Sequence, residues 1–231
     1  MKAMILAAGI GSRMRPLTDT LPKPLLQVKG QPLIVHTIRA LAQAGINAIV
    51  INVHYQAQQI IDYLGDGAQY GVQIHYSLEV ELLDTGGGVK QALPLLGDHP
   101  FLVVSADVYT DFPFAKLTTV SPQLAHLVMV DNPDFHQHGD YALRNGVLSM
   151  LGKNKLTYAN IGVLQPALFA ADLYAAAMPA AESAVMPKFF PLNILFREAI
   201  RRCEVSGEHY TGDWYNIGTP ELLDAVNADI T

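Results

Sequence analysis

An apolar strand that runs straight into a loop of small residues opens this chain and decides its fold: Met4-Ile5-Leu6-Ala7-Ala8-Gly9-Ile10-Gly11-Ser12-Arg13-Met14-Arg15-Pro16-Leu17-Thr18. The segment Pro22-Lys23-Pro24-Leu25-Leu26 follows at once. Because glycine has no Cβ, main-chain N–H groups of such a loop can approach phosphate oxygens closely. Arg13 adds a forked cation, and Lys23 adds a point charge between two stiff prolines. This combination indicates a site for a nucleoside triphosphate.

Two other phosphate-binding loops are excluded by spacing. The P-loop requires a glycine, four residues and then Gly-Lys-Ser/Thr, and no such run follows Leu6. The dinucleotide-binding fingerprint requires a third glycine where this chain has Met14.

Composition favours a compact enzyme that acts on small molecules. The chain of 231 residues carries 15 basic and 21 acidic residues, a net charge of −6, without a basic block, which argues against nucleic acid as a partner. No apolar run reaches the roughly 20 residues that a membrane span requires. The single Cys203 cannot form an internal disulfide, so we expect a cytoplasmic protein, either a monomer or a weak homo-oligomer.

Strand patterns alternate with helical patterns along the chain, which predicts a mostly parallel sheet. The expected strands are Lys2–Leu6, Ala48–Val53, Val72–Tyr76, Phe101–Ser105, Leu124–Val130, Thr157–Leu164 and Trp214–Ile217, with a hairpin over Tyr141–Gly152. The expected helices are Leu33–Ala44, Ala57–Leu64, Gly87–Leu95, Leu192–Arg202 and Thr219–Ala228. No linker divides the chain, so we expect one domain over 1–231, with a nucleotide-binding half (1–110) and a substrate-binding half (111–231).

The opening segment resembles that of sugar-1-phosphate nucleotidyltransferases, which carry Gly-x-Gly-x-Arg-x-x-Pro-Leu-Thr followed by Pro-Lys-Pro. The resemblance implies a Rossmann-like α/β/α fold of three layers, GT-A-like, around a mostly parallel mixed sheet. It also implies a set of nucleotide-binding residues, among which Arg13 and Lys23 are catalytic: Ala8, Gly9, Gly11, Ser12, Arg13, Lys23, Thr85, Gly86 and Ser105.

Asp107 and Asn216 are the candidate Mg²⁺ ligands. Asp107 follows a buried strand, at the sheet edge where ligands collect, and Mg²⁺ prefers few protein carboxylates. In the resembled family an aspartate at this place binds the metal, usually after a glycine where this chain has Ala106. The family's second metal carboxylate is replaced here by Asn216, whose amide oxygen brings no charge. The alternative interpretations are a helix cap for Asp107 and a turn residue without metal contact for Asn216.

Leu82-Leu83-Asp84-Thr85-Gly86-Gly87-Gly88 is the expected base-binding loop. The resemblance places main-chain groups of Thr85 and Gly86 against the edge of the base; a flexible turn with Thr85 as a helix cap is the alternative. The loop is most similar to that of N-acetylmuramate α-1-phosphate uridylyltransferases, as are Phe196–Ile200 and Val205–Glu208, and this favours UTP.

Asp140 and Asn160 stand in two segments that line the sugar-phosphate pocket in the resembled family, Gly139–Leu143 and Ala159–Gly162. Asp140 is expected to accept hydrogen bonds from sugar hydroxyls, and Asn160 can both donate and accept. The competing interpretations are an ordinary loop residue and a residue that fills a bulge.

The resemblance therefore implies a Mg²⁺-dependent enzyme that joins UTP to a sugar 1-phosphate, preferentially N-acetylmuramate α-1-phosphate, with release of pyrophosphate in peptidoglycan precursor recycling. The acceptor phosphate is itself the nucleophile, so the protein must supply alignment and charge neutralisation. Mannose-1-phosphate guanylyltransferase, glucose-1-phosphate thymidylyltransferase and choline-phosphate cytidylyltransferase activities stay open. So does a catalytically silent regulator that only binds nucleotide.

Overall fold

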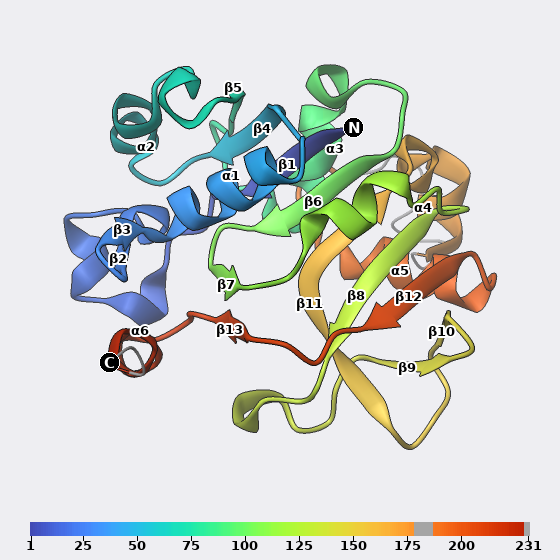
Figure 1. Ribbon diagram of the computed structural model, residues 1–231. Coiled ribbons are helices and arrows are strands. Elements are labelled where there is room, and N and C mark those ends of the chain that lie inside the picture. The colour runs from blue at the N-terminus through green and yellow to red at the C-terminus, as the bar shows by residue number, and fades with distance from the viewer. Residues whose placement is uncertain (178–186, 229–231) are drawn as a thin grey trace.

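The centre of the molecule is a mixed sheet of nine strands, seen in a computed structural model that describes residues 1–177 and 187–228 (Figure 1). The strands are β1 (Lys2–Leu6), β4 (Ala48–Val53), β5 (Gln73–Leu78), β6 (Phe101–Ser105), β8 (Ala125–Val130), β9 (Tyr141–Arg144), β10 (Val147–Ser149), β11 (Lys155–Leu164) and β12 (Val205–His209). Their order across the sheet is β5-β4-β1-β6-β11-β8-β12-β10-β9.

Helices cover both faces of this sheet. They are α1 (Leu33–Gln43), α2 (Ala57–Leu64), α3 (Asp84–Leu96), α4 (Ala171–Ala177), α5 (Asn193–Arg201) and α6 (Pro220–Ala228). The apolar sides of α1 and α2 contribute to one core cluster, and those of α3, α4 and α5 to a second cluster on the opposite face. The three-layer α/β/α arrangement expected from the sequence is confirmed.

Parallel pairing is concentrated in the first half of the chain. β1 lies between β4 and β6, and β4 pairs with β5, all in parallel, because helical crossovers connect these strands. β11 instead runs antiparallel to both β6 and β8. The start of β11 also pairs antiparallel with β9, the first strand of the β9–β10 hairpin.

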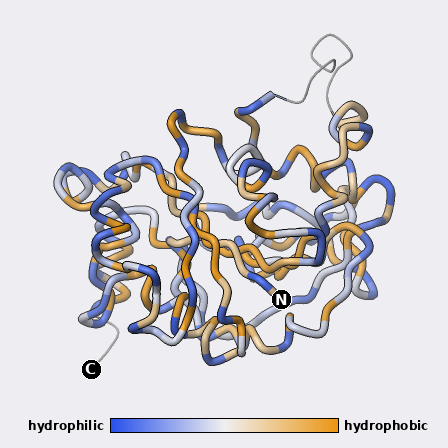
Figure 2. Tube along the Cα trace, turned by 90° about the horizontal axis from the view of Figure 1, so that it is seen from above, coloured by the Kyte–Doolittle hydropathy of each residue, from blue (hydrophilic) through white to orange (hydrophobic). Residues whose placement is uncertain are grey.

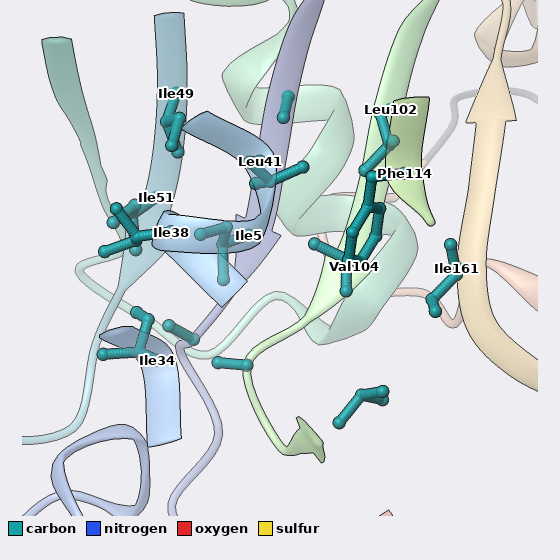
Figure 3. Packing of buried hydrophobic residues seen from close by; sticks show 14 of the residues in the cluster. Ile5, Ile34, Ile38, Leu41, Ile49, Ile51, Leu102, Val104, Phe114 and Ile161 are labelled. Carbon is teal, nitrogen blue, oxygen red and sulfur yellow. The ribbon is translucent and has the colours of Figure 1, made fainter. Parts of the chain in front are cut away.

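The first core cluster fixes α1 against the parallel strands. In Figure 3, Ile34 and Ile38 of α1 face Ile5 and Ile51 of the sheet, and all four side chains are fully buried. Figure 2 shows the same division along the chain, with apolar segments through the middle of the molecule and polar segments around its periphery. Burial of each such aliphatic side chain stabilises the fold by about 1.5–3 kcal/mol.

The end of the chain returns to its beginning. β13 (Trp214–Asn216) pairs antiparallel with β7 (Val108–Thr110), and Leu223 and Val226 of α6 pack on Met14 in a third buried cluster. The short elements β7, β12 and α4 were not expected from the sequence, and α3 begins at Asp84, three residues earlier than expected. None of the helices in the described parts of the chain is long and apolar enough to cross a membrane.

Candidate active site

The loop after β1 forms a tight turn whose shape requires glycine. Gly11 has a φ of +68° and precedes a 3₁₀ turn over Ser12–Met14, in which the Met14 N–H donates to the Gly11 carbonyl at 2.9 Å. A Cβ on Gly11 would lie 3.0 Å from Thr18 Cγ2 and 3.2 Å from Lys23 Cβ. A side chain at this position would therefore strain the main chain and displace Thr18 or Lys23 by a few tenths of an ångström.

A cavity of about 430 Å³ opens above this loop, at the carboxyl ends of β1, β4 and β6. Eight of the nine expected nucleotide-binding residues line it, together with Asp107 from the expected metal pair: Ala8, Gly9, Gly11, Ser12, Arg13, Lys23, Thr85 and Ser105. Gly86 does not. Gly218, from the chain's closing segment, completes the wall on the Arg13 side.

Arg13 lies against this closing segment. The position of a Cβ on Gly218 would be 3.5 Å from an Arg13 guanidinium nitrogen, which is an ordinary contact distance, so the guanidinium lies directly against this segment. Within residues 1–177 and 187–228, the Arg13 side chain has no ion-pair partner. Its positive charge is thus available to an anion in the cavity.

Lys23 and Asp107 form an ion pair inside the cavity. Lys23 Nζ donates to Asp107 Oδ2 at 2.6 Å, with 13% of the lysine side chain and 27% of the aspartate side chain exposed. The Pro22–Pro24 segment sets the main chain of Lys23 at the start of a 3₁₀ turn, and Asp107 stands two residues beyond the end of β6. An ammonium group carries three donors, so Lys23 keeps two for a substrate oxygen.

The main chain of Asn216 lies beside that of Asp107. In the β7–β13 ladder Asn216 is paired with Val108, and the next residue, Ile217, donates its N–H to the Asp107 carbonyl at 2.9 Å. The Oδ1 atom of Asn216 is buried and accepts no hydrogen bond from the described residues. A buried amide oxygen without a donor is costly unless another group satisfies it.

The donor types of these two residues match a hard divalent cation, but Asn216 is not among the residues that line the cavity, so a metal shared by the pair stays a prediction. A carboxylate and a neutral amide oxygen are ligands of the kind that Mg²⁺ accepts, with water and phosphate oxygens in its other positions. No group of three or more His, Cys, Asp or Glu side chains able to hold a metal occurs in the described parts of the chain. Any Mg²⁺ held here would depend on one protein carboxylate and on its substrates.

The glycines at the start of α3 have a different neighbour from the one expected. The N–H groups of Gly86 and Gly87 both donate to the Phe190 carbonyl, at 2.9 and 3.1 Å. The Thr85 N–H donates to Asp84 Oδ1 at 2.6 Å. Thr85 borders the cavity, but the amides of Thr85 and Gly86 are engaged within the protein, so they are not free to bind the edge of a base.

A buried polar network on the cavity wall was missed by the sequence reasoning. Asn52 Oδ1 accepts the Ala7 N–H at 2.9 Å, and Asn52 Nδ2 donates to Glu79 Oε1 at 2.7 Å. Glu79 Oε2 accepts the Leu83 N–H at 3.0 Å. Asn52 and Glu79 are 3% and 2% exposed and line the cavity. The one polar residue inside the apolar run Ala48–Val53 could have indicated this network.

Asp140 and Asn160 lie outside the cavity. Asp140 Oδ2 accepts the Tyr158 N–H at 2.8 Å, and its Oδ1 is 3.1 Å from His136 Nε2. Asn160 has a φ of +57° within an irregular stretch of β11, between Tyr158 and Gly162. Burial, together with the negative charge of Asp140, raises the pKa of the nearby Tyr141 to about 12. Both residues have structural roles in this part of the sheet, and their contact with a sugar stays a prediction.

Comparison with known proteins places this arrangement in a family. Residues 2–141 match the family model described as nucleotidyl transferase. The chain is 44% identical over 237 aligned residues to N-acetylmuramate alpha-1-phosphate uridylyltransferase of Neisseria meningitidis serogroup B, with 99% of this chain and 97% of that protein covered. It is 45% identical over 120 residues to mannose-1-phosphate guanyltransferase of Hypocrea jecorina, covering 51% of this chain and 33% of that one.

Solved structures agree on the fold. A putative glucose-1-phosphate thymidylyltransferase from Bacillus anthracis superposes with a TM-score of 0.82 at 21% identity, over 99% of this chain and 94% of that one. A UDP-glucose pyrophosphorylase complexed with UDP-glucose gives 0.75 at 20% identity, over 99% and 98%. With its phosphate loop, its sheet and nearly its whole length matched, this chain belongs to the nucleotidyl transferase family.

Proposed function

We propose that this protein transfers the uridylyl group of UTP to N-acetylmuramate α-1-phosphate, forming the UDP-sugar and pyrophosphate in a Mg²⁺-dependent reaction. The observation that carries the proposal is the single cavity in which the loop Ala8–Arg13 meets Lys23, Asp107 and the buried carboxylate of Glu79. The similarity over nearly the full length of the meningococcal uridylyltransferase supports the choice of substrates.

The reaction needs two anionic substrates held in line. A phosphate oxygen of the acceptor attacks the α-phosphorus of UTP, the bond from that phosphorus to the bridging oxygen breaks, and pyrophosphate leaves. No protein nucleophile is required. The work of the protein is to align the two phosphates and to neutralise the charge that develops between them.

Two cations of the chain carry out that neutralisation. Arg13 has no ion-pair partner in the described structure and would hold the departing β- and γ-phosphates through its forked donors. Lys23 Nζ, fixed at 2.6 Å from Asp107, would direct its remaining donors to the α-phosphate oxygens. Asp107 and Asn216 would hold Mg²⁺, which would supply positive charge against the repulsion between the two anionic substrates.

The base is selected by a hydrogen-bond acceptor. Both Glu79 oxygens already accept one hydrogen bond each, and each retains a second acceptor position. Uracil presents the donor N3–H, whereas cytosine presents an acceptor at the same position. Pairing a carboxylate with an acceptor would leave both groups unsatisfied, at a cost of roughly 1–3 kcal/mol. This geometry supports UTP over CTP, while guanine, with its N1–H donor, must be distinguished by experiment.

The test is pyrophosphate release from four nucleotides, UTP, CTP, GTP and dTTP, each with N-acetylmuramate 1-phosphate, glucose 1-phosphate, mannose 1-phosphate or choline phosphate. We expect UTP with N-acetylmuramate 1-phosphate to give the highest kcat/KM, and CTP to fall at least tenfold below UTP. Preference for CTP and choline phosphate would replace this function with a cytidylyltransferase activity. Nucleotide binding without pyrophosphate from any pair would identify a silent binding protein.

A further inference from the structure

Gly86 and Gly87, in the first turn of α3, form a seat for a segment from the other half of the chain, residues 187–192. The Gly86 and Gly87 N–H groups hold the Phe190 carbonyl, the Phe190 N–H donates to the Leu83 carbonyl at 3.2 Å, and Thr85 Oγ1 accepts the Leu192 N–H at 2.8 Å. Four hydrogen bonds therefore fix this segment to the start of the helix.

The contact is close enough to exclude side chains from the helix. A Cβ on Gly86 would lie 2.3 Å from the Phe190 ring, and a Cβ on Gly87 would lie 1.9 Å from the Lys188 carbonyl oxygen. The Phe190 ring is 2% exposed and packs edge-on against Tyr174 of α4, with ring centroids 5.4 Å apart. The glycines are thus explained by main-chain packing, and the segment is anchored from both sides.

Phe189 is the residue that this anchored segment presents to the cavity. Its side chain is 58% exposed, and it lines the same 430 Å³ space as the phosphate loop and Lys23. When a ligand covers an exposed phenyl ring, the burial of apolar surface favours binding. Because the main chain of this ring is already fixed, binding costs little additional ordering of the main chain. A ring placed in this way is suited to the apolar face of a bound molecule.

We propose that Phe189 is a specificity-determining residue for the acceptor, whose pyranose ring and whose acetyl and lactyl methyl groups pack against the phenyl face. The inference rests on the proposed function. The segment comes from the part of the chain whose helices α4 and α5 cover the β8–β12 side of the sheet, and it reaches the cavity from there. The groups suited to the nucleotide, from Ala7 to Arg13 and at Asn52 and Glu79, lie on β1, β4 and β5 or directly after them.

The test compares Phe189→Ala, Phe189→Tyr and a matched control, Phe135→Ala. Phe135 is 60% exposed but lies in the 3₁₀ turn Asp134–His136, away from the cavity-lining residues. For each variant, the UTP Kd is measured calorimetrically without acceptor, and KM and kcat are measured for N-acetylmuramate 1-phosphate and glucose 1-phosphate. Thermal unfolding confirms that each variant is folded.

We expect Phe189→Ala to raise the KM for N-acetylmuramate 1-phosphate about tenfold and to leave the UTP Kd within twofold. Phe189→Tyr should restore KM to within threefold of wild type, and Phe135→Ala should change neither quantity. The ratio of kcat/KM for N-acetylmuramate 1-phosphate to that for glucose 1-phosphate, which lacks the acetyl and lactyl groups, should be smaller in Phe189→Ala than in wild type.

Three outcomes would overturn this assignment. A weaker UTP Kd with unchanged acceptor KM would place the ring on the nucleobase. Equal behaviour of Phe189→Ala and Phe135→Ala, with an active wild type, would remove Phe189 from recognition and leave the proposed function standing. A folded wild-type protein without turnover of UTP and N-acetylmuramate 1-phosphate would instead overturn the proposed function, and this inference with it.

Discussion

Replacement of Glu79 by glutamine tests the buried network on the cavity wall. Both neighbours of the carboxylate are donors, Asn52 Nδ2 at 2.7 Å and the Leu83 N–H at 3.0 Å. Glutamine offers one acceptor oxygen and one NH₂ group, so a donor would face a donor at one of the two contacts. Asn52 cannot correct this by turning its amide, because its Oδ1 already accepts the Ala7 N–H.

The magnitude follows from one lost hydrogen bond. A buried donor left without a partner costs about 1–3 kcal/mol. A neutral amide is easier to bury than a carboxylate, which offsets part of that cost. We therefore expect Glu79→Gln to lower the free energy of unfolding by about 1–2 kcal/mol. Since the network connects Ala7 to Leu83, the affinity for UTP should fall as well, and discrimination against CTP should narrow.

The assay is urea unfolding followed by circular dichroism, with UTP and CTP kinetics on the same preparations. Glu81→Gln is the matched control, because Glu81 is exposed, two residues away in the same loop, and does not line the cavity. The free energy of unfolding of Glu81→Gln should lie within about 0.5 kcal/mol of the wild-type value. If Glu79→Gln is as stable as Glu81→Gln, with unchanged selectivity for the base, the network does not hold the loop as we describe.

Three further predictions concern the cavity. Lys23→Ala should lower kcat by around 10²- to 10³-fold while UTP affinity stays within several-fold, measured by steady-state kinetics and calorimetry. Asn216→Asp should lower the Mg²⁺ concentration needed for half-maximal activity and tighten Mn²⁺ binding in titrations, because it adds a carboxylate. Asp107→Asn should nearly abolish the activity and the Mn²⁺ binding. Gly87→Ala brings a Cβ to 1.9 Å from the Lys188 carbonyl oxygen, so the segment must move. Urea unfolding should show a loss of about 1–3 kcal/mol, and acceptor KM should rise as in Phe189→Ala.

Each of these has a contrary outcome. Near-normal turnover in Lys23→Ala would remove the lysine from the mechanism. Unchanged metal dependence in Asn216→Asp, with Asp107→Asn inactive, would leave Asp107 and the substrates to hold the ion alone. A Gly87→Ala variant of wild-type stability and acceptor KM would show that the contact with Lys188 relaxes without consequence.

Much of the fold was predictable because its elements are locally encoded. The bounds of β1, β4, α2 and β6 agree with the apolar runs and helical periodicity of the sequence. β7 was missed because it has only three residues, and β12 because its sequence Val-Ser-Gly-Glu-His has no apolar run; both strands are defined by their partners, β13 and β8, rather than by their own pattern. The early start of α3 was missed because helix propensity disfavours three successive glycines; in the fold Gly86 and Gly87 donate to the Phe190 carbonyl, and Gly88 lies against Glu79 and Asn52.

The residues of the candidate site also divide into those predictable from local sequence and those that depend on distant partners. The sequence alone predicted that Gly11, Arg13 and Lys23 belong to one site, because they stand close together in the chain, and all three line the cavity. It also identified Asp107, since the end of a buried strand is a position set by local pattern.

Only the tertiary structure decided what depends on distant partners. In the fold, the Gly86 and Gly87 N–H groups donate to the Phe190 carbonyl, and Asn52 donates to Glu79. The carboxylate of Asp140 accepts the Tyr158 N–H. Composition and spacing do not specify which donor meets which acceptor across 18 to 104 residues of chain. Close packing makes that choice, because a buried polar group must find whichever partner the folded chain brings within reach.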